Sequence, residues 1–224
     1  MGLHDQQIYN PDDPKILQVQ KQAQLKMYEY NQTLPTEDTK RQQLMKEMLG
    51  KVGTGCYFEP PFHANFGGKH VMLGDHVYAN SNLTVVDDTY VYIGDHTMMG
   101  PNVTLASAGH PVLPELREQG YQFNLPIHIG KNCWLGAGVI VVPGVTIGDN
   151  TVVGAGAVVT KDLPANVVAV GVPANTTTVR CRLTPSCSHK AKFIKVIGAE
   201  SSYYCTDNFS FLSKRCIIII INTN

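Results

Sequence analysis

The sequence lacks the features that mark several large classes of protein. Among its 224 residues, Lys and Arg total 18 and Asp and Glu total 18, so no net charge favours nucleic acid or an anionic membrane as a partner. The longest aliphatic run is five isoleucines near the C-terminus, far short of the roughly 20 apolar residues that span a bilayer. The first residues, MGLHDQQIYNPDDP, have neither the basic start nor the apolar core of a signal peptide. We therefore expect a cytoplasmic protein whose partner is a small molecule or another copy of itself.

Paired cysteine motifs are also missing. Cys56 and Cys133 stand alone, and the other four of the six cysteines lie at or beyond position 181 without a CxxC pair. This spacing predicts neither a disulfide framework nor a structural zinc site. We expect reduced thiols and no bound metal.

Two stretches near the N-terminus have helical spacing. Residues 13–31 carry an apolar side that includes Ile16, Leu17 and Leu25. Residues 33–53 follow, with Pro35 and Thr36 as the expected helix start and Gly50 as its end. The sequence therefore predicts an N-terminal helical segment, residues 1–55, that forms a hairpin.

A period of six residues begins near position 71. Aliphatic or small side chains recur at this interval. They occupy Leu73, Ala79 and Val85, then, once the spacing has slipped by two residues, Ile93, Met99 and Leu105. The last six are Ile129, Leu135, Val141, Ile147, Val153 and Val159. Glycine follows many of them, and we expect it to supply the backbone freedom of a sharp corner. Short strands joined at corners satisfy this period, with three units in each coil of about 18 residues. The sequence thus predicts a mainly β fold, a left-handed parallel β-helix of triangular section over residues 56–174.

Residues 106–126 interrupt the period without destroying it. Ile129 follows Leu105 by 24 residues, which is four units of six, so the register continues beyond the interruption. We expect a protruding loop, and loops on a rigid scaffold commonly carry binding groups. His110 lies in this loop, in AGHPVLP, where a neutral imidazole could take a proton from a hydroxyl. A surface histidine without a catalytic role fits the same pattern.

Several motifs resemble a known family. YANSNLTVVDD, GPNVTLASAGHP, NCWLGAGVIVVPGVTIGDN and VVGAGAVVTKDLPANVVAVGVP, together with the helical start YNPDDP, are similar to the maltose and galactoside O-acetyltransferases of the hexapeptide-repeat acyltransferases. The resemblance implies acetyl-CoA as co-substrate, a sugar acceptor such as maltose, glucose or a galactoside, and a homotrimer with active sites between subunits. It implies that His110 is the general base for direct attack of the acceptor hydroxyl on the thioester.

The resemblance also implies the acceptor-binding residues. Tyr78, Asn80 and Asp88 match family positions at the acceptor, although Asn and Asp are common at corners for local reasons. NPDDP offers Asp12 or Asp13 for a further contact, and we take Asp12 as the candidate. The family's DYG segment is NFGG here, so Asn65 replaces a carboxylate.

The cofactor positions follow in the same way. By resemblance, Trp134 to Ala137 line the pantetheine channel, the Ala137 N–H stabilises the oxyanion, and Ala155, Thr160 and Lys161 contact CoA. The arginines that the family places after GxP are absent, because ANTTTVRCRL follows GVP here. Arg180 or Arg182 could substitute only with a shifted backbone, and we take Arg180 as the candidate.

Other interpretations stay open from the sequence. An acetyltransferase for another hydroxyl compound, such as an antibiotic, would keep His110. A zinc-dependent carbonic anhydrase on the same solenoid would need three converging histidines; His70, His76 and His96 lie in the early coils, but none matches the spacing of that family. A non-enzymatic scaffold is the third alternative. The atypical tail, residues 175–224, is either an added strand or the product of an altered reading frame.

Overall fold

The computed structural model describes residues 7–177, 194–196 and 218–220. The chain divides into two compact units, Met1–Thr176 and Thr177–Asn224. In the second unit, β19 (Ile194–Val196) pairs in parallel with β20 (Ile218–Ile220), which lies in the isoleucine run. Arg180 and four of the cysteines lie outside the described residues. No helix in the described part of the chain is long and apolar enough to cross a membrane.

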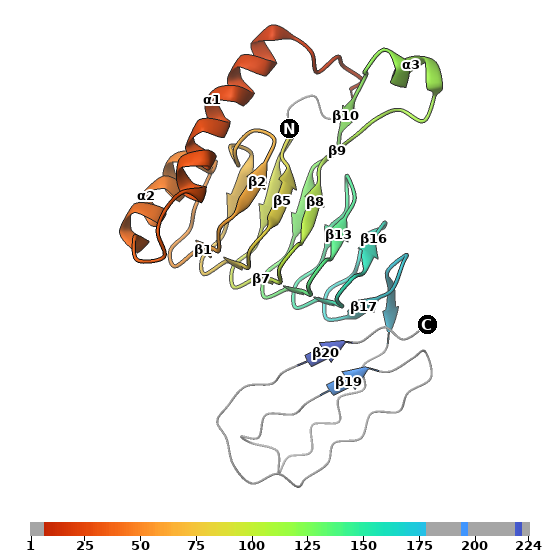
Figure 1. The fold of residues 1–224 in the computed structure, drawn as a ribbon. Helices are drawn as coiled ribbons and strands as arrows, with labels where there is room; N and C mark the ends of the chain where they lie inside the picture. Colours follow the sequence, from red (N-terminus) through yellow and green to blue (C-terminus); the bar gives the residue numbers. More distant parts are fainter. Residues whose placement is uncertain (1–6, 178–193, 197–217, 221–224) are drawn as a thin grey trace, which may run out of the picture. The chain divides into compact units, whose positions relative to one another are not determined.

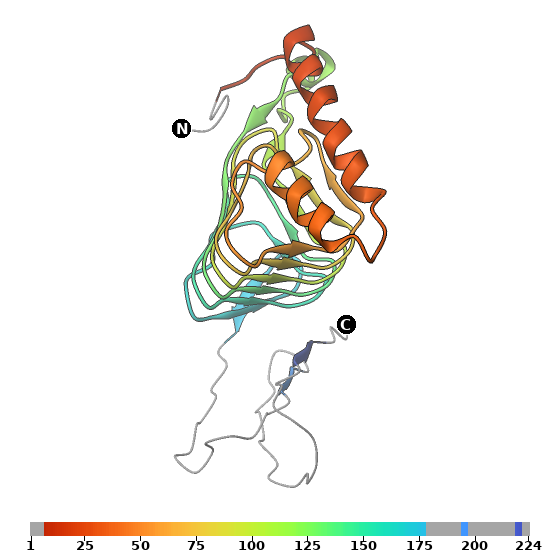
Figure 2. The same ribbon diagram turned by 90° about the vertical axis from the view of Figure 1, so that its left-hand side faces the viewer.

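The first unit is a parallel β-helix with three sides, as predicted (Figure 2). Side I contains β1 (Tyr57–Phe58), β4 (Tyr78–Ala79), β7 (Met98–Met99), β12 (Trp134–Leu135), β15 (Val152–Val153), β17 (Val168–Val170) and β18 (Asn175–Thr177). Side II contains β2 (Phe62–Ala64), β5 (Leu83–Val86), β8 (Thr104–Ala106), β13 (Ile140–Val141) and β16 (Val158–Val159). Side III contains β3 (Val71–Leu73), β6 (Val91–Ile93), β11 (Ile127–Ile129) and β14 (Thr146–Ile147). The chain passes from side I to side II to side III in each coil.

The predicted six-residue positions form the core. Leu135 stacks between Met99 and Val153 on side I, and Val141 stacks between Leu105 and Val159 on side II. All six are at most 1% exposed. Each fully buried aliphatic side chain stabilises the fold by roughly 1.5–3 kcal/mol, so the repeat itself holds the coils together.

The expectation that the periodic glycines supply unusual backbone angles is wrong. Gly136, which follows Leu135, is not among the residues with positive φ, but a Cβ on it would lie 2.6 Å from the Ala155 nitrogen of the next coil. The periodic glycines therefore allow coils to approach closely. Positive φ falls two residues later, at Gly138 (+70°) or at asparagines such as Asn102 (+60°), which tolerate this region better than most residues.

The N-terminal hairpin consists of α1 (Pro14–Asn31) and α2 (Asp38–Met48), and α1 lies along the first coils (Figure 1). Asp13 caps α1 by accepting from the Lys15 N–H at 2.8 Å, and Pro14 occupies the first helical position, where its missing N–H costs nothing. The Tyr30 hydroxyl donates to the Phe58 carbonyl and ties α1 to side I.

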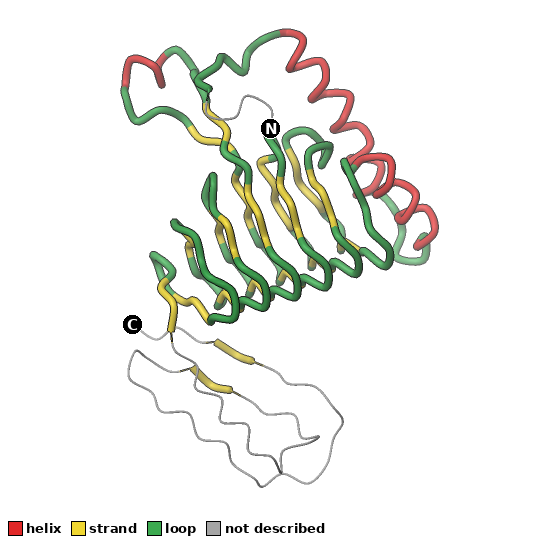
Figure 3. The backbone as a smooth tube through the Cα atoms, turned by 180° about the vertical axis from the view of Figure 1, so that it is seen from behind, coloured by secondary structure: helices red, strands yellow, loops and turns green. Residues whose placement is uncertain are grey.

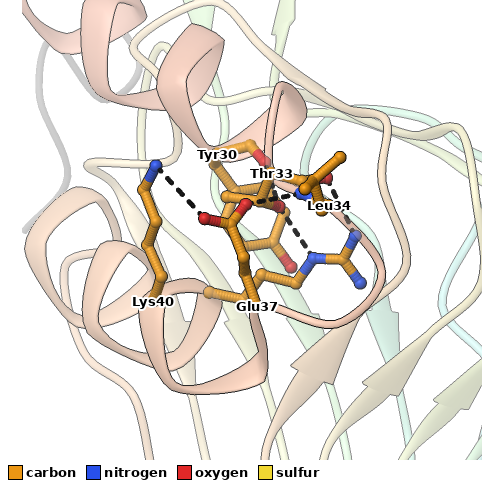
Figure 4. Close-up of polar contacts among 6 residues, drawn as sticks. Tyr30, Thr33, Leu34, Glu37 and Lys40 are labelled. Carbon is orange, nitrogen blue, oxygen red and sulfur yellow. Dashed lines mark hydrogen bonds and ion pairs between the residues drawn. The ribbon is translucent and has the colours of Figure 1, made fainter.

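The second helix begins at Asp38, later than the Pro35–Thr36 start expected from the sequence. Glu37 causes the delay because it closes a turn: its N–H donates to the Leu34 carbonyl at 3.0 Å, and its carboxylate accepts from the Leu34 N–H at 2.6 Å (Figure 4). The Lys40 ammonium lies 3.9 Å from the same carboxylate.

The loop at 106–126 leaves the solenoid after β8 and returns at β11 (Figures 1 and 3). It contains β9 (Ala108–Gly109), the short helix α3 (Pro114–Glu118) and β10 (Phe123–Asn124). Strands β9 and β10 pair antiparallel, so the loop is a hairpin with a helical tip.

Candidate active site

Most of the predicted site residues lie on two different corners of the triangular coil. We call the corner between sides I and II edge A, and the corner between sides II and III edge B. Edge A carries Asn80, Ala137 and Ala155, each directly after or two residues after a strand of side I. Edge B carries Asn65, Asp88, the loop with His110, Thr160 and Lys161. Asn80 and Asp88 thus lie beyond opposite ends of β5.

His110 is exposed, and its ring is oriented by the loop itself. The Nδ1 atom lies 2.8 Å from the Tyr121 carbonyl oxygen. Because a carbonyl oxygen can only accept, Nδ1 carries the proton and the lone pair of the neutral ring is on Nε2. The Arg117 guanidinium fixes the chain after His110 by donating to the carbonyls of Pro111 and Val112 at 3.1 and 2.7 Å. The geometry leaves Nε2 as a proton acceptor.

Asp88 is buried beside the loop in a polar cluster. Its Oδ1 accepts from Gln122 Nε2 at 2.8 Å and its Oδ2 accepts from Asn65 Nδ2 at 2.8 Å. Gln122 Nε2 and Asn124 Nδ2 also donate to the Tyr9 hydroxyl oxygen, at 2.8 and 3.0 Å. Burial raises the pKa of Tyr9, which keeps this hydroxyl neutral. We call these five residues the polar cluster.

Sequence reasoning missed Tyr9, Gln122 and Asn124. Gln122 and Asn124 lie in the non-periodic loop, where no spacing rule singles them out, and Tyr9 reaches them from the N-terminal segment, 113 residues before Gln122. Tyr9 and Gln122 pair through both backbone groups, with N–H to carbonyl distances of 3.0 and 2.9 Å. The N-terminal segment therefore adds a third backbone segment beside the loop.

The amide at position 65 fits its partner. Asn65 donates to the Asp88 carboxylate, so a carboxylate at position 65 would place two negative charges within hydrogen-bond distance. The amide removes that repulsion, and Asp88 keeps donors on both oxygens.

Asp87 and Asp88 have different surroundings although they are adjacent. Asp87 is fully buried and accepts from the backbone N–H groups of Phe66 and Gly68 at 2.7 and 3.0 Å. Burial raises its pKa. Asp87 therefore holds the NFGG turn, and Asp88 faces the loop.

The structure separates the two candidate N-terminal aspartates. Both are exposed, but the Asp13 carboxylate caps α1. The Asp12 carboxylate lies 3.9 Å from the position that a Cβ on Gly120 would occupy. Within residues 7–177 no hydrogen bond or ion pair involves the Asp12 carboxylate, so Asp12 is the better candidate beside the His110 loop.

Edge A is lined by small residues. Ala137 and Ala155 are exposed at equivalent corners of successive coils. In the described part of the chain, no hydrogen-bond acceptor lies on the Ala137 N–H. On side I, Trp134 is half-buried between Met98 and Val152 of the neighbouring coils, and Tyr78 is half-buried next to Met98. The Ala137 N–H, close in sequence to the Trp134 side chain, could therefore donate a hydrogen bond to an oxygen of a ligand.

Thr160 and Lys161 are exposed on edge B, directly after β16. Within residues 7–177, no carboxylate lies within ion-pair distance of the Lys161 ammonium. The ammonium is therefore available to a phosphate.

The three histidines considered for zinc do not converge. His70 is buried against Phe66 and Tyr90, whereas the His76 and His96 rings stack on each other at the corner between sides III and I, 5.0 Å apart. Among the described residues, no group of three or more His, Cys, Asp or Glu side chains could hold a metal ion. Cys56 and Cys133 are buried free thiols, and burial raises the pKa of both.

A groove of about 560 Å³ lies on side III, and Met72, Tyr92 and His128 line part of it. None of the predicted site residues lines this groove. This groove is thus separate from edge A and from edge B.

Two protein-family models match this chain, one over the N-terminal helical hairpin and one over part of the β-helix. Residues 4–53 match the maltose acetyltransferase hexapeptide capping motif, and residues 126–161 match the bacterial transferase hexapeptide of six repeats. The chain is 52% identical over 178 residues to the galactoside O-acetyltransferase of Escherichia coli (strain K12), covering 79% of this chain and 84% of the relative. It is 50% identical over 171 residues to the galactoside O-acetyltransferase of Lactococcus lactis subsp. lactis (strain IL1403), covering 76% and 83%.

Solved structures agree with these relatives. A galactoside acetyltransferase in complex with coenzyme A has a TM-score of 0.74 and 44% identity, covering 77% of this chain and 86% of that one. A maltose O-acetyltransferase from Clostridium difficile 630 has a TM-score of 0.75 and 36% identity, covering 76% and 91%. The predicted fold and the predicted resemblance are both confirmed.

Proposed function

Since the chain belongs to the galactoside and maltose O-acetyltransferases built on hexapeptide repeats, and is therefore an acetyl-CoA-dependent acyltransferase, we propose that its acceptor is a sugar hydroxyl and that His110 is the general base. One observation carries the proposal: the Tyr121 carbonyl holds the proton on Nδ1, which leaves the lone pair on Nε2. An exposed, oriented, neutral imidazole suits proton removal near neutral pH.

The reaction balances without an acyl-enzyme. His110 Nε2 takes the hydroxyl proton as the sugar oxygen attacks the thioester carbon, and the carbonyl oxygen becomes an oxyanion. The open N–H of Ala137 is suited to donate to that oxyanion. Collapse breaks the C–S bond, and the imidazolium returns its proton to the CoA sulfur. Holding both reactants together supplies the proximity.

The placement of the residues supports a site shared by two protomers of a homotrimer. Edge A and edge B lie at opposite ends of the strands of side II, so one protomer does not gather both sets. On edge A the acceptor residue Asn80 lies on an early coil and the cofactor residue Ala155 on a late coil. Edge B has the same order, with Asp88 early and Lys161 late. If edge A of one protomer faced edge B of the next, the two acceptor residues would lie toward one end of the interface and the two cofactor residues toward the other. Acetyl-CoA would then lie between them.

Side I offers an apolar surface for such an assembly. Outward from its strands lie Tyr78, Met98, Trp134 and Val152 in adjacent coils, and Met98 is 50% exposed. Contact with another copy would remove this row from water. Asn80, Ala137 and Ala155 border the row, so the same contact would cover edge A.

The test is release of free CoA thiol from acetyl-CoA with maltose, glucose or a β-galactoside as acceptor. Removal of a general base by His110→Ala should lower kcat by roughly 10²–10⁴-fold, while the fold stays intact because the side chain is exposed. His128→Ala, which removes an exposed imidazole from side III, is the matched control and should keep kcat. Equal activity of His110→Ala and the natural protein would refute His110 as the base.

A further inference from the structure

The loop that carries His110 is attached to the solenoid through the side chain of Gln122. Gln122 is 8% exposed, and its amide nitrogen lies 2.8 Å from Asp88 Oδ1, 2.8 Å from the Tyr9 hydroxyl and 3.1 Å from Asn124 Oδ1. Its backbone pairs with Tyr9 in both directions. A single residue thus contacts edge B, the N-terminal segment and the strand β10 that follows it.

Gln122 is also the covalent neighbour of the group that orients His110. The carbonyl that accepts from His110 Nδ1 belongs to Tyr121, whose carbon is bonded to the Gln122 nitrogen. That nitrogen donates to the Tyr9 carbonyl at 2.9 Å, so the plane of the 121–122 peptide is fixed. A shift of residue 122 therefore moves the Tyr121 oxygen directly.

The Asp88 carboxylate reaches the His110 loop through Gln122, and the Asp88 backbone carbonyl also accepts from Asn124 Nδ2 at 3.2 Å. Both carboxylate oxygens accept amide donors, from Asn65 and Gln122, and in residues 7–177 no hydrogen bond joins Asp88 to the His110 ring. The Asp88 carboxylate therefore orients the loop strand, and the strand orients the base.

We propose that Gln122 is a positioning residue for acetyl transfer, which fixes the tautomer and direction of the His110 ring by fastening the Tyr121 carbonyl to Asp88 and Tyr9. It acts through the backbone and touches neither substrate nor the reacting atoms. The inference rests on the proposed role of His110, but its structural part, control of the ring, is measurable without substrate.

The experiment compares the natural protein with Gln122→Met, which keeps the length of the side chain and removes the amide. The ¹⁵N shifts of the His110 ring, assigned by their loss in His110→Ala, report which nitrogen carries the proton. We expect the Nδ1–H form in the natural protein and a mixture of tautomers in Gln122→Met. Displacement of a catalytic group by about 1 Å can cost roughly 10²-fold, so kcat should fall by roughly 10–10²-fold with an unchanged KM for acetyl-CoA.

Two further variants keep the test decisive. Gln119→Met removes an amide from the same loop, where Nε2 donates to the Glu115 carbonyl at 3.0 Å, and should change neither the tautomer nor kcat. If Gln122→Met does not fold, Gln122→Glu preserves the shape and places a second carboxylate against Asp88. Repulsion between the two carboxylates should displace residue 122, lower kcat and give a mixture of His110 tautomers.

The outcomes separate this inference from the proposed function. A Gln122 variant that keeps the Nδ1–H tautomer and the natural kcat, and loses only thermal stability, overturns the positioning role. A mixed tautomer with unchanged kcat would mean that Gln122 orients His110 but His110 is not the base, and the proposed function would fail instead. A mixed tautomer with a lower kcat supports both.

Discussion

The two edges of the solenoid that carry the site differ in regularity. Along edge A, consecutive core positions are always six apart, as from Met99 to Leu105 and from Leu135 to Val141. Along edge B the spacing changes from coil to coil: eight residues from Val85 to Ile93, 24 from Leu105 to Ile129, and four from Val159 to Leu163. The first two departures contain Asp88 and His110. Edge A supplies repeated backbone geometry, and edge B supplies individual side chains.

This difference has a physical basis. On edge A each coil lies directly against the next, since Cβ atoms on Gly100 and Gly136 would lie within 3.0 Å of backbone atoms of the following coil. Extra residues there would break the stacking. Edge B has room for turns and a hairpin, so polar side chains can be added there without disturbing the core.

The largest effect should come from mixing protomers that are defective on different edges. His110→Ala and Asn80→Ala are each expected to be impaired alone. In trimers formed by co-expression, a site that combines edge B of one protomer with edge A of another should be intact in about a quarter of cases, and acetyl transfer should return to that level.

Two variants of the same edge provide the control for that experiment. His110→Ala mixed with Asp88→Ala alters edge B of every protomer, so no site regains both side chains. Recovery of activity in this pair, or no recovery in the first pair, would show that edge A and edge B of neighbouring protomers do not combine as proposed. A monomeric mass in solution would lead to the same conclusion.

A second prediction tests whether regular edge A takes part in the chemistry. Ala137→Pro removes the N–H proposed for the oxyanion, and loss of one such donor costs roughly 10²–10³-fold in kcat. The fold should tolerate the change because Pro101 already occupies the equivalent corner of the preceding coil, before Asn102 with positive φ.

Ala155→Pro is the comparison for Ala137→Pro, at the same corner one coil later. It should raise the KM for acetyl-CoA rather than lower kcat, because Ala155 is proposed to contact the pantetheine and not the reacting carbonyl. Equal kcat values for Ala137→Pro and the natural protein would remove edge A from the chemical step.

The smallest predicted effect concerns stability. Gly136→Ala places a methyl group against the Ala155 backbone, and overpacking of this kind costs about 1–3 kcal/mol in the free energy of unfolding. Gln119→Ala, an exposed change in the loop on edge B, should stay within about 0.5 kcal/mol. Urea denaturation of both variants checks this, and equal midpoints would show that edge A does not constrain the coils.

Part of the candidate site could be located from the sequence because a repeat carries its own register. The break in the six-residue spacing pointed to the loop that carries His110, whereas Ala137 and Ala155 were assigned through the family resemblance. Gln122, Asn124 and Tyr9 could not be found this way, since no periodicity relates position 9 to position 122. The periodic glycines were located correctly but interpreted wrongly, because close approach between coils is a property of the stacked structure and not of one corner.

The sequence by itself determined the β-helix, its core positions and the place where the loop leaves it, because the inward side chains recur at a fixed interval and must all be buried. Only the tertiary structure decided which groups surround His110. The Tyr121 carbonyl and Gln122 within the loop meet His110, Asp88 and Tyr9 through contacts between residues that are 11 to 113 positions apart. Such contacts depend on the path of the hairpin and the N-terminal segment in space, which local spacing does not encode.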